Sequence, residues 1–191
     1  MKTKFDMQRE KALKQLADAR AEGKADEDIT ELIDLINSRK DFYTTSSCAG
    51  RICLLQTPME HDKLESKWLG KWHKKVTLHY IKEALAKHDE NVVYLQAECP
   101  ILHVVARDIE SAKELLFLAQ QSGFKRSGIQ SVNDERVLLE LLSTEHLEVP
   151  IAENGKVLVD EEYLEFLVEV ANTKWQRGRE KLDKFLEVLS K

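Results

Sequence analysis

The spacing of hydrophobic residues predicts helices at both ends of the chain. Residues 4–20 form a charged helical segment, and Gly23 breaks it. A second helix begins near Asp26 or Asp28, because aliphatic residues recur at the helical period and Asp28 with Glu31 has the spacing of a capping box. Its apolar stripe consists of Ile29, Leu32, Ile33 and Ile36. Beyond Asp160, the same period predicts one long amphipathic helix through Leu164, Leu167, Ala171, Trp175, Leu182 and Leu189.

Short apolar runs predict strands in the middle of the chain. The predicted strands are Ile52–Leu55, Trp68–Val76, Val92–Ala97, Ile101–Ala106, Phe124–Val132, Arg136–Ser143, Glu148–Ile151 and Lys156–Val159. The polar stretch 57–67 carries Pro58 and predicts a loop. Asn154 followed by Gly155 is typical of a two-residue hairpin turn between the last two strands.

Two further helices are predicted among these strands. The first spans Thr77–Lys87, and the second begins after Asp108, which is a favourable N-terminal cap. In the second helix one face is shared by Ile109, Ala112, Leu116 and Ala119. Gly123 stands where a left-handed residue ends such a helix.

The order of elements predicts an α+β fold. From Trp68 to Ser143 the first six elements match a split β-α-β unit, so we expect a mixed or antiparallel sheet built around it. Helices at the N-terminus (about 4–38) and the C-terminus (about 160–190) would flank this sheet in a single domain over residues 1–191. No GxGxxG follows a strand, which argues against a doubly wound nucleotide-binding fold.

Composition and charge limit the possible functions. The chain is 42% hydrophobic and 33% charged, and its net charge of −5 argues against indiscriminate coating of nucleic acid, although a local basic patch remains compatible with it. No apolar run approaches the ~20 residues of a membrane helix. Three cysteines are too few for a disulfide framework or a structural zinc site. We therefore expect a cytoplasmic protein with no membrane, DNA or metal partner.

The segment TTSSCAGR, residues 44–51, is the first candidate for chemistry. Hydroxyls of Ser46 and Ser47 can donate and accept hydrogen bonds, Gly50 allows a ligand to approach the backbone, and Arg51 suits a phosphate or carboxylate. The segment is thus interpreted as an anion- or carboxylate-binding turn. The structural alternative is a plain helix-to-strand connection with Cys48 packed in the core.

Two further segments are cationic. In GKWHKK, Trp72 could stack on a base while Lys71, Lys74 and Lys75 meet phosphates. The alternative is an exposed edge strand with solubilising lysines. After the helix end at Gly123, a basic turn formed by Lys125, Arg126 and Ser127 could hold a phosphate, or could be a plain loop.

Two histidines are candidate proton acceptors. His73 lies in the cationic segment, and His103 lies in the apolar strand ILHVVA, where a lone histidine is more often a hydrogen-bonded core residue. Histidine titrates near neutral pH, so either side chain could act as a general base. We prefer His73, because its polar surroundings can admit a charged RNA.

Six segments, in this order, resemble the tRNA wybutosine-synthesizing protein 3 family, and together they cover nearly the whole chain. They are DFYTTSSCAGRI (Asp41–Ile52), GKWH (Gly70–His73), LHV (Leu102–Val104), SGFKRSGI (Ser122–Ile129), ST-x-H-x-E-VP (Ser143–Pro150) and EEYLEFLVEVAN (Glu161–Asn172).

The resemblance implies an S-adenosylmethionine-dependent tRNA methyltransferase of wybutosine biosynthesis. Its substrate would be the N(4) ring nitrogen of a 7-aminocarboxypropyl-demethylwyosine base beside the anticodon of phenylalanine tRNA. Family members lack the doubly wound methyltransferase fold, in agreement with the missing glycine fingerprint.

The resemblance adds expected roles to the candidate residues. Those for the cofactor are Ser46, Ser47, Cys48, Gly50 and Arg51, with Ser46, Ser47 and Arg51 holding its carboxylate or an RNA phosphate. Those for the anticodon loop are Lys71, Trp72, Lys74, Lys75, Lys125, Arg126 and Ser127. Two alternatives stay open: a non-catalytic RNA-binding module of the tRNA-modification pathway, and a cysteine-dependent transferase centred on Cys48.

Overall fold

The chain divides into two compact units, each assembled from separate stretches of sequence. A computed structural model describes residues 2–59 and 65–191. Unit 1 comprises Met1–Ala49, Pro100–Thr144 and Arg179–Lys191, and unit 2 comprises Gly50–Cys99 and Glu145–Gly178. The single domain expected over residues 1–191 stays a prediction, and each unit is described by itself.

Unit 1 contains a four-stranded antiparallel sheet in the order β1-β5-β7-β6. Its strands are β1 (Phe42–Cys48), β5 (Ile101–Ala106), β6 (Gly128–Asn133) and β7 (Arg136–Leu142). Because β5 and β6 are both antiparallel to β7 between them, helix α4 (Ile109–Gln121) connects two parallel strands. This is a split β-α-β arrangement.

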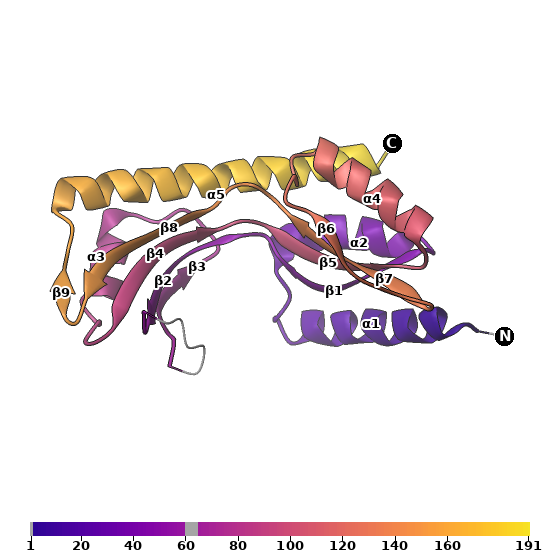
Figure 1. Cartoon of the computed structure of the whole chain (residues 1–191), viewed down its shortest axis with the longest axis horizontal. Helices are drawn as coiled ribbons and strands as arrows, with labels where there is room; N and C mark the ends of the chain where they lie inside the picture. The colour runs from indigo at the N-terminus through magenta and orange to yellow at the C-terminus, as the bar shows by residue number, and fades with distance from the viewer. Residues whose placement is uncertain (1, 60–64) are drawn as a thin grey trace. The chain divides into compact units, whose positions relative to one another are not determined.

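Helices cover both faces of the sheet in unit 1 (Figure 1). On one face, buried apolar residues from α2 (Thr30–Ser38), α4 and the last turns of α5 (Glu161–Leu189) form the main core. On the other face lies α1 (Lys4–Ala21), which buries Phe5 against Tyr43 and Val105. A short 3-10 helix, η1 (Glu27–Ile29), precedes α2.

Arg107 ties α1 to the sheet of unit 1. Its Nη2 lies 2.9 Å from an Asp6 oxygen, its Nε lies 2.9 Å from an Asp41 oxygen, and its guanidinium stands over the Phe5 ring at 4.4 Å. Hydrogen bonds from Thr3, followed by the one from Arg107, lower the pKa of Asp6 to about 2. These contacts hold the start of α1 in place although the helix is charged nearly throughout.

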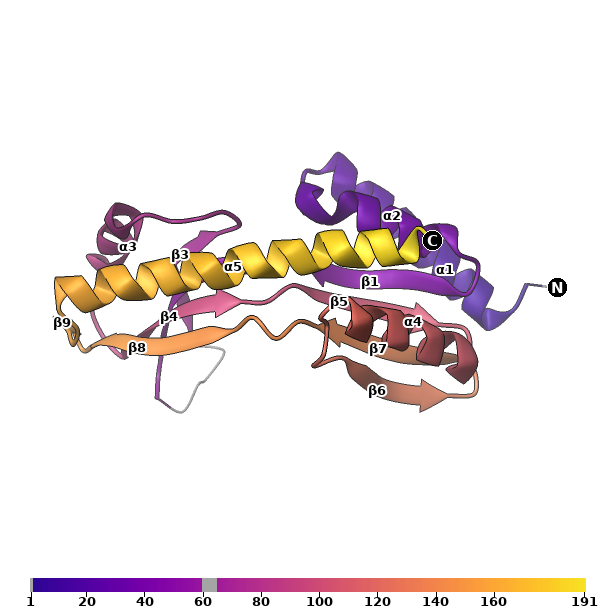
Figure 2. The same cartoon turned by 90° about the horizontal axis from the view of Figure 1, so that it is seen from above.

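Unit 2 contains a five-stranded antiparallel sheet in the order β3-β2-β4-β8-β9, and Figure 2 shows β4 beside β8. The strands are β2 (Arg51–Thr57), β3 (Lys67–Trp72), β4 (Val92–Glu98), β8 (Leu147–Glu153) and β9 (Lys156–Val157). Helix α3 (Leu78–Leu85) joins β3 to β4, which flank β2. The α3 helix and the first part of α5 pack on the same face. Unit 2 therefore has its own split β-α-β arrangement and core.

The expected α+β class with antiparallel pairing is confirmed, but the split β-α-β prediction needs a correction. The six elements from Trp68 onward do not share one sheet, because β3 and β4 belong to unit 2 whereas β5, β6 and β7 belong to unit 1. Each unit forms a smaller split arrangement with a strand from elsewhere in the sequence. None of the helices described here has the length and apolar character that crossing a bilayer requires.

Several local predictions are confirmed and others are wrong. Positive φ angles at Asn154 (48°) and Gly155 (79°) confirm the hairpin turn. The capping box at Asp28 is absent: Asp26 caps η1 instead, and the N-terminus of α2 has no side-chain cap. In α4 the buried residues are Ala112, Leu115 and Ala119, whereas Ile109 is exposed. The predicted strand from Phe124 begins only at Gly128, and the predicted loop 57–67 lies partly outside the described residues.

One glycine of unit 2 is required by close packing. A Cβ added at Gly70 would lie 2.2 Å from the far edge of the Trp72 indole, which packs against the core of unit 2. Gly70→Ala should therefore lower the free energy of unfolding by about 1–3 kcal/mol, measured by urea denaturation. The matched control is Gly128→Ala, since a Cβ there meets nothing within 4 Å. Equal stability of the two variants would contradict this packing argument.

Candidate functional site

The hydroxyl-rich segment is an edge strand of unit 1 and not the turn that the sequence predicts. Residues up to Cys48 pair antiparallel with β5, and the register shifts between Thr44 and Ser46, so that Thr45 forms a bulge. The strand tolerates small polar residues because β5 satisfies its main chain on one side and its other side is a sheet edge. The chain turns only afterwards, at Gly50, whose φ is 91°.

Beside this strand, unit 1 contains a cavity of about 380 Å³. Thr44, Thr45, Ser46 and Ser47 line one side of it. The other lining residues come from α1, the turn before η1 and α2, and they are Ala12, Gln15, Leu16, Ala19, Lys24, Ala25, Asp26 and Ile33. The volume falls within the range of small-molecule sites, and the lining combines apolar walls with a few polar groups, as such sites usually do.

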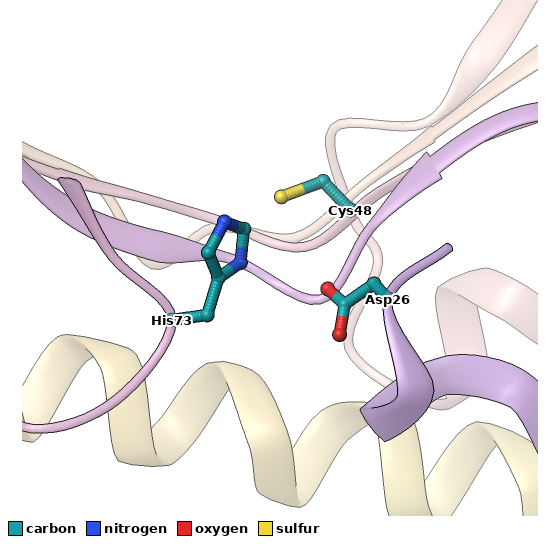
Figure 3. A group of neighbouring side chains, drawn as sticks. All are labelled: Asp26, Cys48 and His73. Carbon is teal, nitrogen blue, oxygen red and sulfur yellow. The ribbon is translucent and has the colours of Figure 1, made fainter. Parts of the chain in front are cut away.

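Asp26 is the functional candidate that sequence reasoning missed. One of its carboxylate oxygens accepts a hydrogen bond from the Ala49 backbone N–H at 3.0 Å, and the other accepts from the Asp28 N–H at 3.3 Å. A carboxylate oxygen of Asp26 lies within 4.8 Å of the Cys48 sulfur, and Figure 3 draws both side chains. The sequence indicated Asp26 only as a helix start, so the fold alone associates it with the hydroxyl strand.

Ser46 belongs to a chain of hydrogen-bonded side chains on the sheet of unit 1. Its Oγ lies 2.8 Å from His103 Nδ1, and His103 Nε2 lies 3.2 Å from a Glu140 oxygen. The second Glu140 oxygen accepts from the Gln130 amide at 3.0 Å. The expected hydrogen-bonded histidine in the apolar strand is thus present. Its partner Glu140 on β7, and Gln130 on β6, which donates to Glu140, were not foreseen from the sequence.

Cys48 lies half-buried at the end of β1, and its sulfur is not part of a disulfide. A carboxylate oxygen of Asp26 lies within 4.8 Å of this sulfur. A nucleophilic cysteine is activated by cationic neighbours, so this contact adds no support to the alternative of a cysteine-dependent transferase.

Arg51 belongs to unit 2, although it is adjacent to the hydroxyl strand in sequence. Its Nε donates to a Glu98 oxygen, and its guanidinium stands 5.0 Å from the centre of the Trp68 ring. Glu98 already supplies the carboxylate that Arg51 was expected to find in a ligand. Trp68 is 44% exposed and was not among the predicted site residues.

The cationic segment Gly70–Lys75 forms the end of β3 and the turn that follows it. Lys71, Lys74 and Lys75 are exposed, as expected for contact with phosphates. Trp72, in contrast, is half-buried and packs against the core of unit 2. His73, also drawn in Figure 3, is exposed and follows β3 directly.

The second basic segment lies in unit 1, between α4 and β6. Lys125 and Arg126 are exposed. The Ser127 hydroxyl donates to the Phe124 carbonyl at 2.6 Å and accepts from the Leu142 N–H at 3.0 Å. Ser127 therefore has a clear structural role that closes this turn, whereas the two basic side chains extend into solvent.

Solved structures share this fold. The chain matches the PH1069 protein from Pyrococcus horikoshii with a TM-score of 0.93 and 41% identity, covering 97% of this chain and 95% of that one. It also matches a hypothetical protein from Aeropyrum pernix with a TM-score of 0.75 and 30% identity, covering 86% and 98% of the two chains.

Sequence comparisons identify the class as a methyltransferase, because the family model described as Methyltransferase TYW3 matches residues 7–191. The chain belongs to this family, as the sequence resemblance predicts. A relative from Thermococcus sibiricus is 43% identical over 98% of this chain and 95% of its own length. A second, from Thermococcus kodakarensis, is 44% identical over 98% and 94%. Both are named tRNA(Phe) 7-((3-amino-3-carboxypropyl)-4-demethylwyosine(37)-N(4))-methyltransferase, the latter with the number 1.

Proposed function

We propose that this chain transfers a methyl group from S-adenosylmethionine to N(4) of 7-aminocarboxypropyl-demethylwyosine at position 37 of phenylalanine tRNA. The observation that carries the proposal is identity above 40% over nearly the full length with relatives named for that reaction. Membership of a methyltransferase family favours this activity over the alternative of a non-catalytic RNA-binding module.

The reaction makes modest demands on the protein. The ring nitrogen forms a bond to the methyl carbon, the carbon–sulfur bond breaks, and the electron pair leaves with sulfur as a neutral thioether. One proton on the nitrogen must be accepted by a base or by water. Bound S-adenosylmethionine supplies an already activated methyl group, so the chain chiefly has to align the three reacting atoms and receive the proton.

The cavity of unit 1 is the proposed cofactor site. Its volume of about 380 Å³ suits a ligand of this size class. The Asp26 carboxylate and the hydroxyls of Ser46 and Ser47 suit the polar amino-acid end, and the aliphatic walls suit the apolar remainder. Cys48, Gly50 and Arg51 remain proposed cofactor residues from the family resemblance, with less expected from Arg51 because Glu98 is its partner.

Substitutions in the cavity test this placement. Asp26→Asn keeps the shape and one acceptor oxygen but removes the charge, and Ser47→Ala removes one hydroxyl. Losing a hydrogen bond to a charged group should weaken S-adenosylhomocysteine binding roughly 10- to 100-fold for Asp26→Asn, and less for Ser47→Ala. Calorimetric titration measures both, with the exposed Ser131→Ala as the matched control. Unchanged affinity in both cavity variants would place the cofactor elsewhere.

His73 is the proposed proton acceptor, and His103 is its competitor. Both ring nitrogens of His103 have partners within unit 1, namely Ser46 and Glu140. To accept a proton from a substrate, His103 would first have to exchange one of these partners. His73 is exposed on the segment that carries the cationic residues, which supports the preference drawn from sequence.

Single-turnover methylation of precursor tRNA distinguishes the two histidines. His73→Ala should lower the rate by about 10²–10⁴, the usual effect of losing a general base, while binding of S-adenosylhomocysteine is retained. His79→Ala removes another exposed histidine of unit 2 and serves as the control. A near-normal rate for His73→Ala would exclude it as the base and would favour transfer of the proton to water.

Exposed cations are the proposed contacts to the anticodon loop. They are Lys71, Lys74 and Lys75 in unit 2 and Lys125 and Arg126 in unit 1. Trp72 and Ser127 stay in the proposal only through the resemblance, since each already has a packing or hydrogen-bonding role. Because the chain is acidic overall, attraction to phosphates should be confined to such segments.

Charge reversal tests the segment in unit 2. The double variant Lys74→Glu, Lys75→Glu should weaken tRNA binding and reduce its salt dependence by about 0.7–0.9 per lost phosphate contact, because fewer counterions are released. Cofactor binding should not change. The control double variant Lys87→Glu, Lys156→Glu alters the net charge equally at exposed positions of the same unit. Equal losses in the two double variants would show a general charge effect and remove the segment from the interface.

A further inference from the structure

A run of four side chains crosses the sheet of unit 1 and ends at the wall of the cavity. Gln130 donates to one oxygen of Glu140, and the other oxygen lies 3.2 Å from His103 Nε2. His103 Nδ1 lies 2.8 Å from Ser46 Oγ, and Ser46 lines the cavity. The four residues come from β6, β7, β5 and β1, so the complete sheet contributes to the orientation of one hydroxyl.

The chemistry of these groups fixes the direction of the hydrogen bonds. An ionised carboxylate only accepts, so the bond from His103 to Glu140 requires the hydrogen to be on Nε2. In a neutral imidazole the other nitrogen, Nδ1, then carries a lone pair and accepts. The Ser46 hydroxyl must therefore donate its single hydrogen to His103.

A hydroxyl that has committed its hydrogen can only accept from a further partner. The remaining capacity of the Ser46 oxygen is thus that of an acceptor, and the acidic residue Asp26 lines the same cavity. The cationic residue of the lining, Lys24, has its Nζ 2.6 Å from a Glu22 oxygen. Such a set of groups favours a ligand that donates hydrogen bonds and carries positive charge, and it disfavours a carboxylate.

We infer that Ser46 accepts a hydrogen bond from the α-ammonium group of an amino-acid ligand, and that His103 and Glu140 are positioning residues that hold Ser46 in this orientation. The inference rests on the proposed function and reverses the expectation that Ser46 holds the methionine carboxylate. Two reactants carry the required group: the methionine end of the cofactor and the aminocarboxypropyl side chain of the substrate base. In either case the cavity would favour a ligand with an α-ammonium group over one without it.

The orientation can be tested without any ligand. Nitrogen-15 NMR of the full chain, at a pH where an ordinary histidine is neutral, reports which ring nitrogen of His103 carries hydrogen. We expect the Nε2–H tautomer in the wild type and a larger share of Nδ1–H in Glu140→Gln, whose amide can donate to Nε2. The control Glu135→Gln removes a half-buried carboxylate, which pairs with Lys4 in the turn before β7, and should not alter the ratio. Predominant Nδ1–H in the wild type would overturn the assigned orientation.

The ligand is tested by comparing partners with and without the amino group. Wild-type protein should bind S-adenosylhomocysteine roughly 10- to 100-fold more tightly than its deaminated analogue if the cofactor supplies the ammonium. Ser46→Ala should lose most of this preference, and Ser131→Ala should keep it. If the substrate supplies the group, Ser46→Ala should instead lose the preference for tRNA that carries the aminocarboxypropyl side chain over tRNA that lacks it.

The outcomes separate this inference from the proposed function. The role of Ser46 would be overturned if Ser46→Ala kept both the preference for S-adenosylhomocysteine over its deaminated analogue and the preference for tRNA with the aminocarboxypropyl side chain. This holds even if methylation is normal. A wild-type protein that binds neither S-adenosylhomocysteine nor tRNA would overturn the proposed function. The tautomer of His103 would still decide the orientation of Ser46 in that case.

Discussion

The antiparallel register between β1 and β5 is the constraint on which the chemistry of unit 1 depends. Leu102 and Val104 of β5 are buried in the main core, so His103 between them must point to the other face. The bulge at Thr45 then places Ser46 opposite His103. A slip of one residue would turn every side chain of β1 to the opposite face and separate the pair. Apolar packing on one side of the sheet thereby determines a polar arrangement on the other.

Patterns of neighbouring residues predicted most helices and strands, whereas they could not predict which strands pair. The periodicity of α2 and α5 and the turn at Asn154 and Gly155 depend on neighbouring residues, so the sequence displays them directly. Strands β4 and β5 are separated only by Cys99 and Pro100, yet they belong to different sheets. Their partners, β2 and β8 on one side and β1 and β7 on the other, lie far away in the sequence. The hydrophobic pattern of a strand indicates that the strand has a buried face, but it does not indicate which sheet the strand joins.

The same distinction applies to the candidate site. The hydroxyl-rich segment was recognisable because its composition is unusual for a strand. Glu140 was not, since an acidic residue in an alternating strand usually indicates a solvent-facing position, and its contact with His103 exists only through the pairing of β5 with β7. Asp26 carried only the signal of a helix start. Both residues gain their candidate roles from tertiary contacts. Both are acidic, whereas the site residues predicted for this segment were hydroxyl residues, Cys48, Gly50 and Arg51.

The eight residues from Thr44 to Arg51 satisfy two demands at once. The chain leaves unit 1 after Ala49 and enters unit 2 at Gly50, so the segment contains this crossing point as well as residues that line a cavity. Ala49 is buried and its N–H is bound by Asp26, and Gly50 adopts a left-handed φ that other residues reach only with strain. Asp26 consequently contributes to both, because this residue lines the cavity and its carboxylate accepts a hydrogen bond from the Ala49 N–H. Its substitution by an apolar residue would therefore remove both backbone hydrogen bonds together with the charge, whereas asparagine removes the charge and retains one acceptor oxygen for the Ala49 N–H.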